Sequence, residues 1–167
     1  MNIYKKQKIP QSTINALCRY LENIILPYDK SIFKNEYEIF CILEDMQNIA
    51  LTNYVKTIFD NLLITPDNID SVILYTIIIL SRVKSKGLQF NSKTCHKLIL
   101  IILMISSKIV EDEPYTNLSW ANIGKISLEN CNRMEFYIVK LLNYNLFVSH
   151  HNITSVTESL FFHNFSS

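Results

Sequence analysis

The sequence predicts an all-α domain, and three observations support this prediction. Apolar residues recur at the spacing of helix faces in one segment after another. Only 2 glycines and 4 prolines interrupt the 167 residues, and the segments are joined by short connections. Apolar side chains make up 49% of the chain, which is enough for one sizeable core. We therefore expect a five-helix bundle over residues 51–148, preceded by a helical extension over 1–50 and followed by a tail over 149–167.

The extension carries two modest helix patterns. They cover residues 12–26 and 31–43, and in each the apolar residues fall on one face. Pro27 and Asp29 separate them, because proline and aspartate favour turns over helix interiors.

The first two helices of the bundle are expected over 51–63 and 66–83. The first has a clean amphipathic pattern. The second has start signals, with Thr65 as N-cap and Pro66 at the first helical position. Its many β-branched residues would also suit a strand, but its length and its basic end before Gly87 favour a helix.

The third helix of the bundle is expected over 92–110, with Asn91 or Ser92 as its cap. Residues 98–105 form an unbroken apolar run. A helix that is apolar nearly all round is one that other helices surround.

Two more helices complete the bundle, over 116–123 and 127–142. Gly124 is expected to lie just after the first of them, and Ser127 begins the second. The tail from residue 149 has weak helix character, so we expect it to fray.

Two charged residues stand among apolar neighbours. Lys108 ends the very apolar third helix, and Glu135 lies within the fifth. Such charges are costly unless they are paired or reach solvent, so both are candidate functional residues. The fifth helix also has more apolar positions than one buried stripe needs. Either its own domain encloses it, or Glu135, Val139 and Leu142 form a second face for another protein.

The sequence lacks the usual signatures of an enzyme. It has no glycine-rich phosphate loop, no His-Glu-x-x-His, no Cys-x-x-Cys and no nucleophile elbow. The histidines at 150, 151 and 163 fit a polar, aromatic tail at least as well as a metal site. The cysteines lack paired spacing, so free buried thiols are expected at Cys18, Cys41, Cys95 and Cys131. We expect no catalysis, no cofactor and no metal.

Charge and hydropathy argue against a nucleic-acid partner and against a membrane-spanning segment. The net charge of +1, without a basic stripe, argues against nucleic-acid binding. The longest apolar run is far short of the ~20 residues that cross a membrane. No secretion signal is evident, and we expect an intracellular protein, in the nucleus, the cytoplasm or both.

Three strings of residues resemble the cyclin box. They are Ser-Ser-Lys-Ile-Val-Glu-Asp-Glu-Pro-Tyr-Thr-Asn at 106–117, Trp-Ala-Asn-Ile-Gly at 120–124 and Asn-Arg-Met-Glu at 132–135. More narrowly, they resemble the P/U-type cyclins related to the yeast phosphate-response cyclin. The similarity spans about residues 51–148, one box of five helices. The second helix ends in Leu-Ser-Arg at 80–82 without the usual Asp-Arg pair, and the first lacks the substrate-docking pattern of cell-cycle cyclins.

This resemblance implies a cell-cycle-type regulator, a cyclin subunit that binds and activates a cyclin-dependent serine/threonine kinase as a 1:1 heterodimer. Lys108 and Glu135 match the residues that hydrogen-bond around the kinase αC helix. By the same match, four apolar residues pack on that helix: Ile109, Val139, Tyr144 and Leu146. Together with Leu142, which the helical pattern adds, these residues form the candidate kinase-binding set.

Three other interpretations stay open. The chain could be a cyclin-fold adaptor that binds a non-kinase protein without activating a kinase. It could be a cyclin-fold transcription factor that binds DNA, although its near-neutral charge opposes this. Finally, Lys108 and Glu135 could simply pair with each other in the core of an all-α domain.

Overall fold

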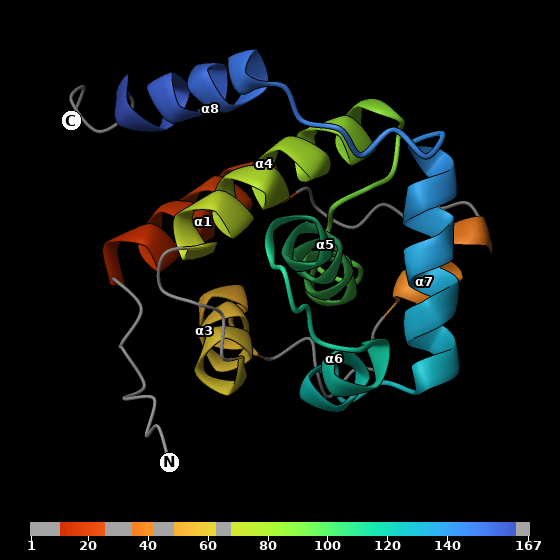
Figure 1. Ribbon diagram of the computed structural model, residues 1–167. Coiled ribbons are helices and arrows are strands. Elements are labelled where there is room, and N and C mark those ends of the chain that lie inside the picture. Colours follow the sequence, from red (N-terminus) through yellow and green to blue (C-terminus); the bar gives the residue numbers. More distant parts are fainter. Residues whose placement is uncertain (1–10, 26–34, 42–48, 63–67, 163–167) are drawn as a thin grey trace.

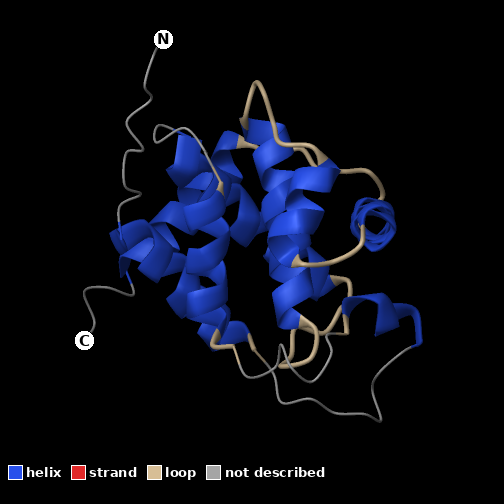
Figure 2. Cartoon of the chain, turned by 90° about the horizontal axis from the view of Figure 1, so that it is seen from below, coloured by secondary structure: helices blue, strands red, loops and turns tan. Residues whose placement is uncertain are grey.

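The structure is a computed structural model that describes residues 11–25, 35–41, 49–62 and 68–162 (Figure 1). In these ranges the chain forms seven α-helices and one 3₁₀ helix, and it forms no strand (Figure 2). The all-α prediction is confirmed. The elements are α1 (Gln11–Ile24), η2 (Asn35–Phe40), α3 (Leu51–Asn61), α4 (Ile69–Ser85), α5 (Cys95–Val110), α6 (Asn117–Gly124), α7 (Leu128–Leu141) and α8 (His150–Phe162).

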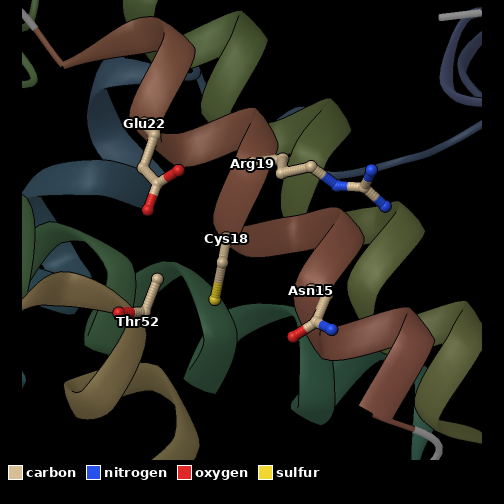
Figure 3. A pocket seen from close by; sticks show the side chains of 5 residues that line it. All are labelled: Asn15, Cys18, Arg19, Glu22 and Thr52. Atoms are coloured by element: carbon tan, nitrogen blue, oxygen red, sulfur yellow. The ribbon is translucent and has the colours of Figure 1, made fainter. Parts of the chain in front are cut away.

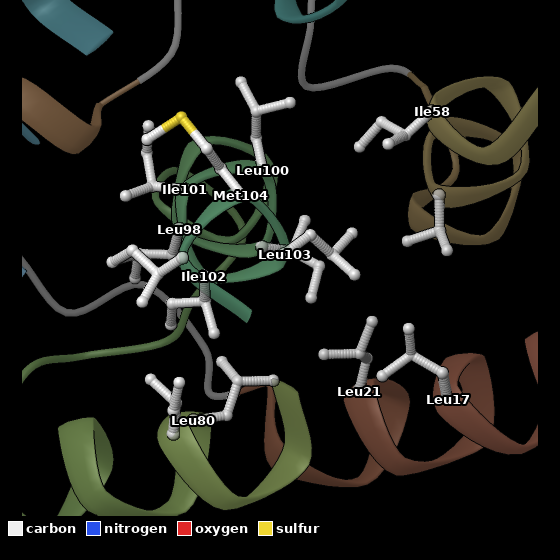
Figure 4. Close-up of a cluster of buried hydrophobic side chains, with 14 of the residues drawn as sticks. Leu17, Leu21, Ile58, Leu80, Leu98, Leu100, Ile101, Ile102, Leu103 and Met104 are labelled. Carbon is white, nitrogen blue, oxygen red and sulfur yellow. The ribbon is translucent and has the colours of Figure 1, made fainter. Parts of the chain in front are cut away.

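Helix α5 lies at the centre of the molecule. In Figure 1 it is seen nearly end-on, with α1 and α4, α3, α6 and α7 around it. Every residue from 98 to 107 is buried, which requires neighbours on all sides of the helix. Figure 4 shows how Leu21 of α1, Ile58 of α3 and Leu80 of α4 approach α5. The run 98–105 therefore predicted the central helix correctly.

The predicted N-terminal extension shares this core. Leu17 and Leu21 of α1 are fully buried, and α1 packs on α3 and α4. Phe40 at the end of η2 is also fully buried, and its ring meets the edge of Tyr137 of α7 with 5.6 Å between centroids. α1 and η2 thus add to the hydrophobic core that the bundle builds.

A half-buried lysine links η2 to α5. Lys97 Nζ donates hydrogen bonds to the carbonyl oxygens of Ile39 and Cys41, at 3.3 and 2.6 Å. Partial burial lowers the pKa of the Lys97 ammonium group. The two carbonyls compensate for that desolvation.

The start of α5 differs from the prediction. The helix begins at Cys95 rather than at residue 92, and Thr94 occupies the cap position. Asn91 Oδ1 accepts hydrogen bonds from the backbone N–H groups of Lys93 and Thr94, at 2.9 and 3.2 Å. Asn91 therefore stabilises a turn ahead of the helix, and Ser92 lies within that turn. The predicted start of α4, at Thr65 and Pro66, lies outside the described residues.

The role predicted for Gly124 is wrong. Gly124 is the last residue of α6, and the left-handed conformation belongs to Lys125, with φ of 53°. A Cβ atom on Gly124 would lie 2.1 Å from Leu100 Cδ2. Glycine is therefore needed at this position because it lets α6 approach α5 closely.

The expectation that the tail frays is also wrong for residues 150–162, which form α8. Ser149 Oγ accepts the N–H of Asn152, and Asn152 Oδ1 accepts the N–H of Ser149, both at 3.2 Å. This reciprocal cap satisfies N–H groups that a helix start leaves unpaired. α8 packs along α4 (Figure 1). No described helix combines the length and apolar character that crossing a membrane requires.

Candidate functional site

Lys108 and Glu135 meet at the edge of the bundle. Lys108 lies in the last turn of α5 and Glu135 in the middle of α7, two helices that pack together. Lys108 Nζ donates a hydrogen bond to Glu135 Oε1 at 2.6 Å, so the two residues form an ion pair. The cost of placing these charges among apolar residues is thus reduced by pairing.

A third residue holds the carboxylate of Glu135. Asn117 Nδ2 donates to Glu135 Oε2 at 2.6 Å and to Asn132 Oδ1 at 2.7 Å. Asn117 is the first residue of α6, which Thr116 caps by accepting the N–H of Ser119. Three helices therefore converge on one carboxylate. Sequence analysis did not assign Asn117 a role, although it ends the first string that resembles the cyclin box.

The pair is neither in the core nor fully in solvent. The side chain of Lys108 is 30% exposed and that of Glu135 is 22% exposed. Burial raises the pKa of the Cys131 thiol to about 11, and the Glu135 carboxylate adds to the rise. The Lys108–Glu135 pair thus lies where the core of the bundle meets solvent, and both side chains are partly exposed.

The apolar residues of the candidate set are exposed or half-buried. Ile109, next to Lys108, is 39% exposed, and Tyr144, just beyond α7, is 65% exposed. Val139 and Leu146 are half-buried against the core. We call the predicted set of these four residues and the ion pair the α5–α7 surface: Lys108, Ile109, Glu135, Val139, Tyr144 and Leu146.

Leu142 does not belong to the α5–α7 surface. It is 5% exposed and lies in the hydrophobic core. The reason is helical periodicity, because Leu142 continues the buried stripe of Cys131, Met134 and Ile138. The expectation that Leu142 faces a partner is wrong. α7 is not enclosed by its own domain, because one stripe of the helix is buried and Phe136, on another side, is exposed.

Sequence analysis missed Phe147, the most exposed large apolar residue of the described chain, at 76%. It lies in the connection between α7 and α8, where no helical pattern assigns a direction to a side chain. A weak signal was present, because Leu146 and Val148 alternate with it and only one side of an extended segment faces a core.

An open groove of about 400 Å³ lies beside α1 (Figure 3). Its lining residues are Asn15, Cys18, Arg19 and Glu22 of α1 and Thr52 of α3. Burial, and then the nearby Glu22 carboxylate, raise the pKa of Cys18 to about 11, so its thiol is a poor nucleophile. Among the described residues, no three His, Cys, Asp or Glu side chains come together as a metal site would need.

Comparison with known proteins identifies the family. The cyclin family model matches residues 5–146, and the chain belongs to this family, with its relatives among the P- and U-type cyclins. The match includes α1 and η2 as well as the five helices α3 to α7 of the predicted cyclin box.

Three relatives illustrate the similarity. Cyclin-P1-1 of Oryza sativa subsp. japonica is 25% identical over 79 residues, which is 47% of this chain and 30% of the relative. Cyclin-U3-1 of Arabidopsis thaliana is 22% identical over 145 residues, or 85% of this chain and 64% of the relative. PHO85 cyclin-6 of Saccharomyces cerevisiae is 26% identical over 81 residues, or 48% and 19%. The chain thus spans less than two thirds of the length of each of these relatives. The cyclin family is a family of regulatory proteins.

Proposed function

We propose that this cyclin binds a cyclin-dependent serine/threonine kinase through the α5–α7 surface and activates it, as a 1:1 complex in the nucleus or cytoplasm. The observation that carries the proposal is the Lys108–Glu135 pair, held by Asn117 at a partly exposed edge. The apolar residues of the α5–α7 surface are exposed or half-buried. Such a centre of hydrogen-bonding charges with apolar neighbours suits a protein interface, where charges fix orientation and apolar groups supply buried area.

The proposed mechanism is selection of the active kinase conformation. An active kinase needs its αC helix in place, so that the αC glutamate pairs with the lysine that binds ATP. α5 is rigid because neighbours enclose it on every side, and α7 is packed against it. A rigid surface that fits only the inward αC arrangement stabilises that arrangement by its difference in affinity.

The charges of the pair allow a sharp test. Lys108→Glu and Glu135→Lys each place like charges 2.6 Å apart in the native geometry, so both the fold and the surface are perturbed. The double variant Lys108→Glu/Glu135→Lys restores an internal ion pair but presents reversed charges to the partner. Lys140→Glu, at an exposed position on α7, is the matched control for a charge reversal.

The experiment begins with the full chain immobilised in lysate of its own organism, and mass spectrometry identifies the kinase. Binding of that purified kinase is then measured by calorimetry, together with thermal unfolding of each variant. We expect both single variants to weaken binding by about tenfold or more. The double variant should recover thermal stability but not binding, and Lys140→Glu should keep both.

Two results would separate the alternatives. If the double variant regains kinase binding along with stability, the pair serves the fold alone and the proposed interface is wrong. Phosphorylation of a peptide substrate, measured with and without the cyclin, tests activation separately. Tight kinase binding without a gain in rate would make the chain an adaptor rather than an activator.

A further inference from the structure

Arg82 connects α4 to a distant part of the chain, the segment from Asn145 to Asn152. It lies near the end of α4, and its guanidinium reaches the connection between α7 and α8. Arg82 Nη1 donates to the carbonyl oxygens of Phe147 and Asn145, at 2.9 and 3.4 Å. Arg82 Nη2 donates to Asn152 Oδ1 at 3.3 Å, within the cap of α8.

The connection that Arg82 binds has a specific shape. Asn143 and Tyr144 both adopt left-handed backbone conformations, with φ of 53° and 59°. Asparagine tolerates this conformation, but tyrosine adopts it only where its surroundings enforce it. The N–H of Tyr144 donates to Val139 O at 2.9 Å, which joins the connection to the last turns of α7.

The direction of each side chain follows from that shape. Tyr144 and Phe147 point to solvent, whereas Leu146 packs on the core and Val148 is buried. Between the end of α7 and the cap at Ser149 the backbone runs without helix or strand. The bonds from Arg82 to two carbonyls of this stretch fix its path across the end of α4. A guanidinium suits this role because its donors form a rigid, planar fork.

We propose that Arg82 is a positioning residue for the α5–α7 surface. It holds the connection so that Tyr144 faces the partner, and it does so without contacting the partner itself. This inference rests on the proposed function, because Tyr144 is one of the residues assigned to kinase binding. The alternative is a purely structural role, in which Arg82 only links α8 to α4 and stabilises the fold.

A double-mutant cycle distinguishes these roles. The variants are Arg82→Met, which keeps an apolar stem but has no donors, Tyr144→Ala, and the two combined. Affinity for the purified kinase is measured by calorimetry, and thermal unfolding is followed for each protein. We expect each single variant to weaken binding by about tenfold. The combined variant should bind about as weakly as either single variant, because both remove the same positioned Tyr144.

Two further variants complete the design. Arg82→Lys keeps the charge but cannot reproduce the fork, so its affinity should fall between those of wild type and Arg82→Met. Thr76→Ala is the control for a purely structural effect. Thr76 is buried on the same helix, where Thr76 Oγ1 donates to Val72 O at 2.7 Å. It should lower the unfolding temperature and leave kinase affinity unchanged.

A kinase-free measurement adds an independent readout. Hydrogen exchange of the Tyr144 amide should speed up in Arg82→Met, because the connection loses its fixed path. The same amide in Thr76→Ala should exchange as in the wild type.

Several outcomes would overturn the inference. If the losses of affinity from Arg82→Met and Tyr144→Ala multiply in the combined variant, Arg82 does not act through Tyr144. If Arg82→Met lowers the unfolding temperature without changing affinity, or if Tyr144→Ala binds normally, nothing is being positioned. Failure of the proposed function is a different result, in which the wild-type chain itself binds no kinase. A wild type whose binding depends on Lys108 but shows no Arg82–Tyr144 coupling would refute this inference alone.

Discussion

Replacing Gly124 with alanine tests whether close packing of α6 on α5 explains this glycine. The added Cβ would lie 2.1 Å from Leu100 Cδ2, 3.2 Å from Leu100 Cγ and 3.3 Å from Leu100 Cδ1. All three atoms belong to one side chain, and Leu100 is fully buried. The leucine must therefore move within a packed core to admit one methyl group.

The expected loss of stability follows from two opposing effects. Inserting a methyl group into a packed core costs roughly 1–3 kcal/mol. Alanine in place of a helical glycine raises the free energy of unfolding by about 0.5–1 kcal/mol, because it lowers the backbone entropy of the unfolded chain. Gly124→Ala should therefore lower the free energy of unfolding by about 1 kcal/mol. For a chain of this size, that corresponds to a fall of about 2–4 °C in the unfolding temperature.

Denaturant unfolding followed by circular dichroism measures the effect, and Leu100→Ala identifies its cause. Leu100→Ala alone should cost about 2–5 kcal/mol because it leaves a cavity. In that background the clash disappears, so Gly124→Ala should become neutral or stabilising. The control is Gly87→Ala, where φ is 86° and nothing lies within 4 Å of the added Cβ. Its cost comes from the backbone and should stay the same in both backgrounds.

If the effects of Gly124→Ala and Leu100→Ala on the free energy of unfolding simply add, contact with Leu100 does not explain this glycine. Additivity would mean that the two positions do not share a packing contact. A stabilising effect of Gly124→Ala in the wild-type background would also refute this explanation, because helix propensity would then outweigh the clash.

Three further predictions concern single side chains. Asn117→Ala should cost about 0.5–1.5 kcal/mol in unfolding free energy because it removes a donor from Glu135. Asn117→Asp should cost more at neutral pH because it places a second carboxylate against that of Glu135. Equal losses for the two variants in calorimetry would contradict this. Burial lowers the pKa of His96, and the hydrogen bond between His96 Nε2 and the Ile49 carbonyl oxygen, at 2.8 Å, offsets part of that fall. The contribution of His96 to the free energy of unfolding should be complete above pH ~6.5 and should decrease as the pH is lowered toward the folded pKa. Urea titrations at several pH values measure this dependence, and the variant His96→Gln should lack it. Cys41 is the one half-exposed thiol among the four cysteines, so a thiol reagent should label it first in the native chain, and earlier labelling of another cysteine would be contrary evidence.

The centre of the fold could be predicted because one physical rule determines it. A helix that is apolar on every side must have neighbours on every side, and residues 98–105 leave α5 no other position. The ends of helices were harder to predict because side-chain geometry decides between adjacent residues. Asn91 and Ser92 have similar preferences as caps, but only the side chain of Asn91 reaches two N–H groups.

The structure of α8 depends on residues that are distant in sequence. Its own pattern is weak, yet α4 packs against it and Arg82 binds its cap residue Asn152. The same is true of Gly124, whose requirement comes from Leu100 on another helix. Local patterns contain no information about such contacts. The local pattern therefore predicted a fraying tail where α8 forms, and it predicted the wrong role for Gly124.

Under the proposed function, the pairing of Lys108 with Glu135 keeps two charges at the edge where a partner would bind. Isolated charges at this edge would be costly when a partner removed their water. In the structure, Lys108 and Asn117 already bind one oxygen each of Glu135, which compensates part of that cost in advance. Each carboxylate oxygen has a second lone pair, and the ammonium group has three donors, so both groups can bond a partner without breaking the pair. The internal pair is therefore compatible with the proposed interface.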